Sequence, residues 1–503
     1  MPINYLPNDP LAQAFAPLRE INPAPDRPGN RAGFTFSGAA NQGLHPIGTS
    51  EFLFWQCREA ALRSVGAWEA LDGRLNRWFG NRRNLRLRQD VGEDLNAFYD
   101  RASLSFFHRT TGSKTTFSGA STDVVAHEAG HAFLDAIRPQ LFDVSLTETG
   151  AFHEAFGDIV AILVALLDQQ IRETLLEVTS DLRQANFVEA TAEDLSDGVR
   201  LAIGPNHPAA KPRRALNVFQ WQNPLLLPTS APPDDLSSEI HSFARVVSGC
   251  IYDTLSNIFN SRPARNQCAL LEAAQVTGRL LIEAARAAPL ETRFFRSIGR
   301  AMIHADTDQN GGANHLAIRD AFAAHNITLG SAAMLAPTSI LAGAAPALTG
   351  KAKKLKVAKE MTPDLAKRMG LSGAARFTFR ALRLAGETIT EAVHDHATKL
   401  DKIHSRLKGV IAMAPTSVLI GSVGQRASIL GGLPDLHGTE DEVTQFVATL
   451  LENDCIKFDK TQAFVSETTQ RLRTHEIKKV GARKVLTRLA FDCFPNCAGR
   501  STS

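Results

Sequence analysis

The chain has 503 residues, of which 44% are hydrophobic, so it can bury sizeable cores, and two or three domains are expected. A formal net charge of only +3 gives no reason to expect nucleic acid or a membrane surface as a partner. The six cysteines are scattered, which excludes a disulfide framework. There is neither a recognisable secretory signal nor an apolar run of about 18 residues, so we expect a soluble, cytoplasmic protein, with secretion by another route left open.

The first 84 residues are expected to form an irregular and helical extension. Residues 1–48 are rich in proline, glycine and asparagine, which favours irregular structure. Residues 50–72 carry apolar side chains at helical spacing and predict an amphipathic helix. Alternating and aromatic residues then predict three short strands, at 85–88, 96–100 and 103–107.

The segment His127-Glu128-Ala129-Gly130-His131 follows, in a helix that Thr122 and Asp123 are expected to cap. Residues four apart lie on one face of a helix, so both imidazoles can bind one metal ion, with Glu128 beside it. Two histidines, a carboxylate base and a third ligand from elsewhere make up a zinc-hydrolase site. The spacing therefore predicts a zinc centre.

A second segment, Gly150-Ala-Phe-His-Glu-Ala-Phe-Gly-Asp158, leads into an apolar stretch and predicts a buried helix. Glu154 and Asp158 are again four residues apart, so one carboxylate can complete a site of two histidines and one glutamate, while the other orients a ligand imidazole. Alternatively, both carboxylates lie on a solvated helix face and the histidines belong to the core. Three ionisable groups within an otherwise apolar helix argue against that alternative, because burying them unpaired is costly.

Beyond these motifs the sequence predicts mainly helices, at 241–258, 268–288, 290–304 and 312–325. Residues 330–372, with small residues, prolines and a lysine run, are interpreted as a linker. Residues 373–503 are expected to form a small α/β domain of unknown role, ending in a hairpin that turns at Gly481.

In combination, these motifs resemble the thermolysin-like gluzincin zinc metallopeptidases over about residues 85–328. The resemblance rests on Asn96-Ala-Phe-Tyr-Asp100, on the two segments above, on His241 with the helix that follows, and on Ala317-Ile-Arg-Asp-Ala-Phe322. It implies an α+β, two-lobed peptidase domain at 85–329, with a β-rich lobe before the active-site helix and a helical lobe after it. The small α/β domain would be an addition to this fold.

The resemblance also assigns roles. His127, His131 and Glu154 would bind Zn²⁺, and Asp158 would orient His127. Glu128 would be the general base, and His241 would hydrogen-bond the oxyanion. Asn96 and Ala97 would lie on an edge strand that pairs with the substrate backbone.

Several residues depart from the family pattern. His153 replaces an asparagine before the glutamate ligand, so Glu148 or His153 could compete with Glu154 as the third ligand. The family's oxyanion tyrosine is missing between the metal helices, where Phe142 lies in roughly its place. Glu239 or Asp235 would have to position His241.

Calcium is a less supported expectation. The family's double-calcium site lacks an expected acid, with Ala165 in that region. A calcium-loop pattern beginning at Asp306 has Ala317 where a glutamate is required, so an ordinary polar turn is expected there.

The resulting hypothesis is a zinc metalloendopeptidase that acts on a peptide or protein substrate through metal-activated water. The main alternative is a non-catalytic, zinc-containing protein-binding module on the same scaffold, and a third is an exopeptidase. Neither the substrate, nor the oligomeric state, nor an inhibitory role for residues 1–84 can be predicted from the sequence.

Overall fold

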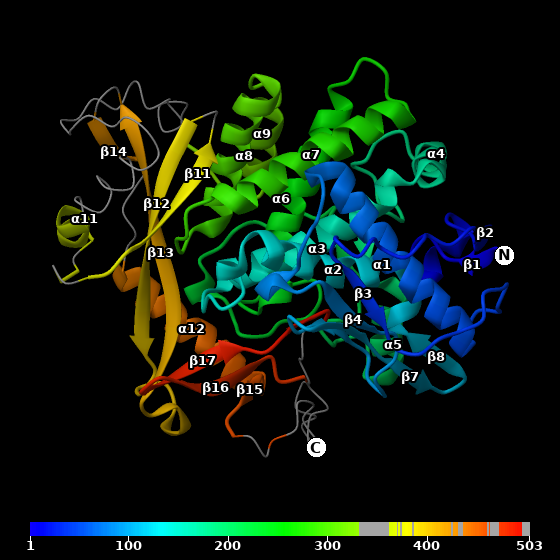
Figure 1. Ribbon diagram of the computed structural model, residues 1–503, viewed down its shortest axis with the longest axis horizontal. Coiled ribbons are helices and arrows are strands. Elements are labelled where there is room, and N and C mark those ends of the chain that lie inside the picture. Colours follow the sequence, from blue (N-terminus) through cyan, green and yellow to red (C-terminus); the bar gives the residue numbers. More distant parts are fainter. Residues whose placement is uncertain are drawn as a thin grey trace.

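Two central helices, α2 (Thr122–Ile137) and α3 (Thr147–Leu167), pack closely in the computed structural model of the chain (Figure 1). A glycine in each helix permits this approach. A Cβ atom on Gly130 would lie 2.8 Å from Cα of Gly157, and one on Gly157 would lie 2.7 Å from Nδ1 of His127. Both distances are too short for a real contact, so the glycines of the two motifs allow α3 to reach the histidine face of α2.

The fold is of the mixed α+β class. The structure describes most of the chain, namely residues 1–330, 362–369, 371–372, 375–384, 387–423, 426–430, 436–459, 462 and 472–494. The lysine run of the predicted linker lies outside these residues.

A five-stranded sheet packs against α2. Its order is β18 (Phe491–Asp492), β5 (Ala97–Tyr99), β6 (Ser103–Phe106), β4 (Asn84–Arg88) and β3 (Gly33–Phe36). The β3–β4 and β4–β6 pairs are parallel, whereas β5 is antiparallel to both of its neighbours. The three strands expected from the sequence are therefore confirmed as β4, β5 and β6. The outer strand β18 comes from the C-terminal end of the described chain.

Shorter elements surround this sheet. The N-terminal segment, expected to be irregular, contains the strands β1 (Ile3–Tyr5) and β2 (Arg19–Ile21) in addition to β3. Two more antiparallel pairs follow, β7 (His108–Thr111) with β8 (Lys114–Phe117) and β9 (Ala190–Thr191) with β10 (Arg213–Arg214).

Helices form the middle of the molecule. Besides α2 and α3 they are α1 (Ser50–Asp72), α4 (Gln169–Val178), α5 (Glu193–Ala202), α6 (Ile240–Asn260), α7 (Gln267–Ala287), α8 (Phe294–Asn310) and α9 (His315–Ala324). The predicted helices near these positions are confirmed. The expectation of a polar turn at Asp306 is wrong, because Asp306 lies in the last turns of α8, which Gly311 ends in a left-handed conformation.

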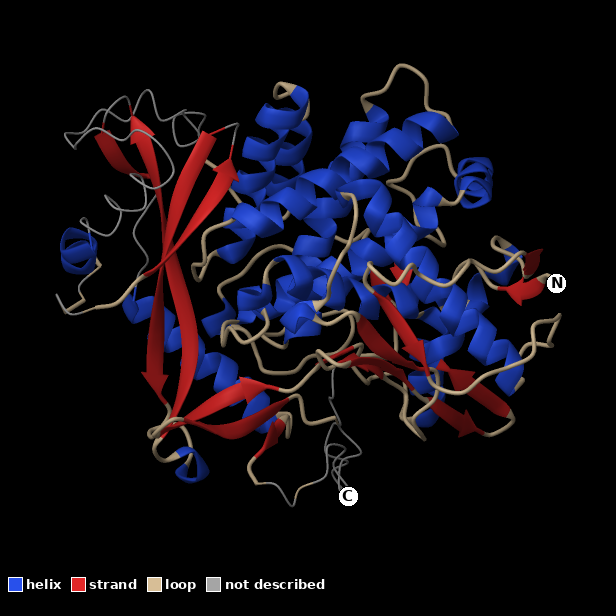
Figure 2. Cartoon of the chain, in the orientation of Figure 1, coloured by secondary structure: helices blue, strands red, loops and turns tan. Residues whose placement is uncertain are grey.

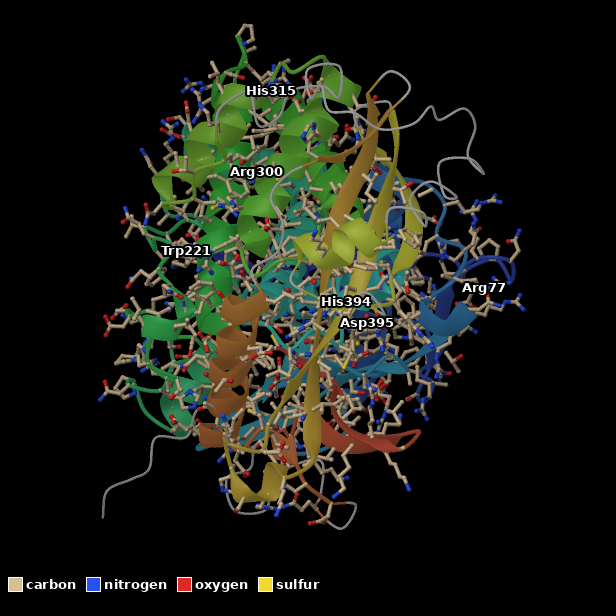
Figure 3. All side chains as sticks on the ribbon, turned by 90° about the vertical axis from the view of Figure 1, so that its left-hand side faces the viewer. Arg77, Trp221, Arg300, His315, His394 and Asp395 are labelled. Carbon is tan, nitrogen blue, oxygen red and sulfur yellow. The ribbon has the colours of Figure 1, made fainter. Side chains whose placement is uncertain are left out.

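A seven-stranded sheet occupies the other side of the helices (Figure 2). Its largest part is the long hairpin of β12 (Glu387–Lys399) and β13 (Val410–Val423), which faces the viewer in Figure 3 with His394 and Asp395 labelled. The other strands are β11 (Thr378–Leu384), β14 (Arg426–Leu430), β15 (Ile456–Lys457), β16 (His475–Val480) and β17 (Arg483–Arg488). The predicted hairpin at Gly481 is confirmed as β16–β17.

The helices α11 (Thr362–Arg368) and α12 (Leu436–Glu452) accompany this sheet, and α12 also contacts α3. One continuous apolar core includes buried side chains of the central helices together with Val410 of β13, Val443 of α12 and Leu486 of β17. The C-terminal sheet is thereby packed directly onto the helices that carry the two motifs.

Helix α3 is long and apolar enough to cross a membrane by length and composition alone. However, 89% of its most apolar window is buried inside the fold, where it contacts α2, α6 and α7. Its hydropathy is accounted for by its place at the centre of the core.

Candidate metal centre

The two histidines of α2 point the same ring atom toward one carboxylate of α3. Nε2 of His127 lies 3.4 Å and Nε2 of His131 lies 3.7 Å from Oε2 of Glu154. All three side chains are completely buried. The structure thus brings together the three ligands that were expected from the sequence.

None of these facing atoms has a hydrogen-bond partner. Neither Nε2 atom nor either carboxylate oxygen of Glu154 forms a hydrogen bond. Buried polar atoms in proteins are nearly always satisfied, because a buried atom without a partner costs about 1–3 kcal/mol. Zinc bonds of about 2.0–2.2 Å in a tetrahedron separate ligand atoms by roughly 3.3 Å, close to the distances found. The donor set and its spacing therefore fit a zinc ion.

The competing ligands are engaged elsewhere. Glu148 accepts hydrogen bonds of 2.8 Å from Nε1 of Trp221 and from the backbone N–H of Phe295. Its carboxylate is buried in that environment, which raises its pKa to about 7. His153 turns Nδ1 toward Nδ1 of His131, at 2.8 Å, and so lies behind a ligand rather than beside it.

Asp158 orients His127, as expected. Its Oδ1 lies 3.0 Å from Nδ1 of His127, and Arg213 of β10 binds the same carboxylate at 2.8 Å. Burial alone would raise the pKa of Asp158, but Arg213 and His127 together hold it below its ordinary value. An ionised Asp158 accepts the Nδ1–H of His127 and so directs Nε2 toward Glu154. Burial lowers the pKa of His127, but Asp158 and Glu154 raise it to about 9. The alternative of a solvated face for Glu154 and Asp158 is wrong, since both are buried.

Glu128 lies beside the ligand atoms, within 4.8 Å of those of His127 and His131. Neither of its carboxylate oxygens has a hydrogen-bond partner. The pKa of Glu128 lies well above its usual range, mainly because the carboxylate is buried. The charge of His127 lowers this pKa, and the charge of Glu154 raises it. A carboxylate with a raised pKa and free oxygens can accept and return a proton near neutral pH.

His241, at the start of α6, approaches the same centre from a third direction. Its Nε2 lies 3.3 Å from Oε2 of Glu154, and its Nδ1 lies 2.7 Å from Oε1 of Glu239. Glu239 also caps α6 by accepting from the backbone N–H groups of His241 and Ser242. The sequence offered Glu239 or Asp235 as the residue that positions His241, and the structure places Glu239 in that contact. Burial lowers the pKa of His241, but Glu154 and Glu239 raise it to about 10, so the ring carries a proton on both nitrogens.

The substrate-binding candidates lie at the strand edge nearest the site. Ala97 begins β5, and Asn96 directly precedes it. The backbone edge they provide is already paired, because the carbonyl oxygen of Ala97 accepts from the N–H of Cys493, 2.9 Å away. The expected edge strand is therefore covered by the chain itself.

Two arginines of the site were missed in the sequence. Arg213 lies in a proline-rich stretch without periodicity, so no local signal identifies it. Arg488 ends β17 and is buried, with its guanidinium 4.0 Å from the ring centroid of Phe491 and Nε donating to the carbonyl oxygen of Phe142. Phe142 itself offers no hydroxyl.

Comparison with known proteins adds no assignment: no family model matches the sequence, and no curated protein matches it.

Proposed function

We propose that the chain is a zinc-dependent metalloendopeptidase of the thermolysin-like gluzincin type. The observation that carries this proposal is the convergence of His127, His131 and Glu154, whose facing atoms are buried without partners next to the free carboxylate of Glu128. Strands before α2 and helices after it are consistent with the two-lobed architecture of that family.

When bound, zinc lowers the pKa of a coordinated water and polarises the peptide carbonyl. The chain's own residues would divide the remaining work. Glu128 would take the proton of the attacking water and deliver it to the leaving amine. His241, protonated on Nε2, would donate a hydrogen bond to the oxygen on which negative charge develops. Asp158 would hold His127 in the tautomer that presents Nε2.

The backbone of a peptide substrate would pair with the edge of β5 at Ala97, and Asn96 would hold it through its amide. A strand added to a sheet edge is bound mainly by backbone hydrogen bonds, which favours an extended internal stretch of chain over a captured terminus. This favours an endopeptidase over an exopeptidase.

A non-catalytic, zinc-containing binding module is the second candidate. The complete burial of His127, His131 and Glu154 favours it, because a purely structural metal site needs no access. However, such a site has no use for a second carboxylate with unpaired oxygens, that of Glu128, or for a protonated histidine that faces the ligands.

The variant Glu128→Gln tests the choice between the two. It removes the base but no ligand, so we expect full zinc content by elemental mass spectrometry and a loss of peptide-library cleavage of at least about 100-fold. Glu173→Gln, a substitution on the surface helix α4, serves as the control and should leave both quantities unchanged. A Glu128→Gln variant that cleaves like the wild type would contradict the proposal.

A further inference from the structure

The two residues of β18 lie along β5 as the outer strand of the five-stranded sheet. Phe491 is opposite Tyr99 and Asp492 is opposite Phe98, in antiparallel register. The pairing continues beyond the strand, because the N–H of Cys493 donates to the carbonyl oxygen of Ala97. In Figure 1 this segment runs from the end of β17 back toward the middle of the molecule.

The next residue is bound by the other substrate-binding candidate. The N–H of Phe494 donates to Oδ1 of Asn96 over 3.2 Å, and Nδ2 of Asn96 donates to the Asp492 carboxylate over 3.3 Å. Asn96 and Ala97 thus hold residues 492–494 through the groups expected to hold a foreign peptide.

The carbonyl groups of the segment face the polar groups of the site. Nε2 of His241 donates to the carbonyl oxygen of Asp492 over 2.6 Å, and the same Nε2 lies 3.3 Å from Glu154. The following carbonyl, that of Cys493, accepts from Nη1 of Arg213, the arginine that also holds Asp158. The peptide bond between Asp492 and Cys493 therefore has its oxygen on the oxyanion donor and its N–H on the sheet edge.

A buried aromatic side chain fixes this register. Phe491 is fully buried and stacks on His153 with ring centroids 3.9 Å apart, while Arg488 covers it. A shift by one residue would move this ring to the other face of the strand, so the position of the Asp492–Cys493 bond is well defined.

We propose that residues 491–494 are an internal substrate and that the site cleaves the Asp492–Cys493 bond of its own chain. The inference rests on the proposed function. In this hydrolysis the C–N bond between the two residues breaks as one water molecule is consumed. Its oxygen joins the Asp492 carbonyl carbon to form a new terminal carboxylate, and Glu128 transfers its proton to the nitrogen of Cys493, which leaves as a new terminal amine.

Self-cleavage would also free the edge of β5 at Asn96 and Ala97. Before the cut, an incoming peptide would have to displace the pairing of Cys493 and Phe494 from Ala97 and Asn96. After the cut, Cys493 and Phe494 are no longer joined to β18 and can dissociate, which frees that edge. Cleavage of other peptides would then follow cleavage of the tail.

The test compares the full-length wild type with full-length Glu128→Gln by intact-mass spectrometry. Each protein is prepared with a chelator and then supplied with zinc. We expect the wild type to lose residues 493–503 and to end at Asp492, with a half-life independent of protein concentration, whereas Glu128→Gln keeps its full mass. A wild type that keeps its full mass, or that is cut at another bond, overturns the inference.

Two substitutions at the leaving residue provide a matched pair. Cys493→Pro removes the N–H that pairs with Ala97 and should abolish the cut, whereas Cys493→Ala keeps that N–H and should be cut like the wild type. Cleavage of Cys493→Pro at the same bond would contradict the proposed register.

A structural measurement on the zinc-free Glu128→Gln chain is independent of activity. The amides of Cys493 and Phe494 should exchange with deuterium more slowly than those of an unstructured peptide. Exchange at the unstructured rate would show that the segment is not paired with Ala97 and Asn96 and would overturn the inference.

Casein added to the same samples separates this inference from the proposed function. An intact tail together with cleaved casein overturns only the inference. If zinc-loaded wild type cleaves neither, and Phe491→Asp, which should displace the segment, does not cleave casein, the proposed function fails as well.

Discussion

The two imidazoles that face Glu154 are one helical turn apart on α2, yet they are supported in different ways. Behind His127 lies the ionised carboxylate of Asp158, which Arg213 holds in place. Behind His131 lies another imidazole, that of His153, at 2.8 Å. Burial lowers the pKa of both His131 and His153 well below the usual range, so that pair is neutral.

The difference matters for ligand strength. A carboxylate that accepts the outer N–H of an imidazole pulls the proton toward itself and makes the inner nitrogen more basic. A neutral imidazole fixes the tautomer but adds no charge. Nε2 of His127 is therefore the more basic of the two inner nitrogens, and His131 has the weaker support.

Asp158→Asn should have the largest effect among the supporting residues. The amide can still accept from Nδ1 of His127, but the charge is lost and Arg213 remains buried without its counter-charge. We expect zinc affinity to fall by about 10–100-fold in competition titrations with a chelator. Asp197→Asn, which removes a partly exposed carboxylate paired with Lys114, should leave the affinity unchanged. An unchanged affinity for Asp158→Asn would contradict the proposed role of the carboxylate.

His153→Leu should have a smaller effect. It removes the acceptor behind His131 but no charge, so we expect zinc affinity to fall by no more than about 10-fold. His153→Asn can accept the same N–H through its amide oxygen and should retain most of the affinity. If His153→Leu proved more damaging than Asp158→Asn, the order of the two supports would be reversed.

Glu148→Gln should change the pH dependence of stability rather than the site. Burial raises the folded-state pKa of Glu148 from 4.5 to about 7. Stability from this group is therefore fully present below pH 4.5 and is lost as the pH rises through about 7. Relative to Glu148→Gln, the wild type should lose about 3 kcal/mol of unfolding free energy across this range, measured by urea denaturation. A pH-independent difference would contradict the raised pKa.

Local patterns predicted the elements that carry the site. Apolar residues at helical spacing identified α1, α6 and α7. The same spacing placed His127 with His131, and Glu154 with Asp158, on one face of their helices, whereas the role of each carboxylate was implied only by the family resemblance. These features depend on residues close together in the sequence, where helix geometry fixes the outcome. The predicted cap was wrong by one residue. Thr122 was expected to cap α2, but it is the first residue of the helix, and Ser121 is the N-cap.

Long-range pairings could not be read in the same way. Asn96 and Asp492 are 396 positions apart, and β18 is only two residues long, too short for any periodic signal. Arg213 reaches Asp158 from a two-residue strand in a proline-rich stretch. Such contacts depend on how the whole chain folds, and therefore only the structure revealed the pairing of residues 491–493 with β5. The domain limits expected from the sequence stay predictions.

The most direct measurement of the proposed centre is an anomalous difference map at the zinc edge from crystals of the full-length protein. A peak bonded to Nε2 of His127, Nε2 of His131 and a carboxylate oxygen of Glu154 is expected. A zinc-supplemented crystal without a peak there, or with its zinc bound elsewhere, would contradict the metal centre and the hydrolytic function built on it.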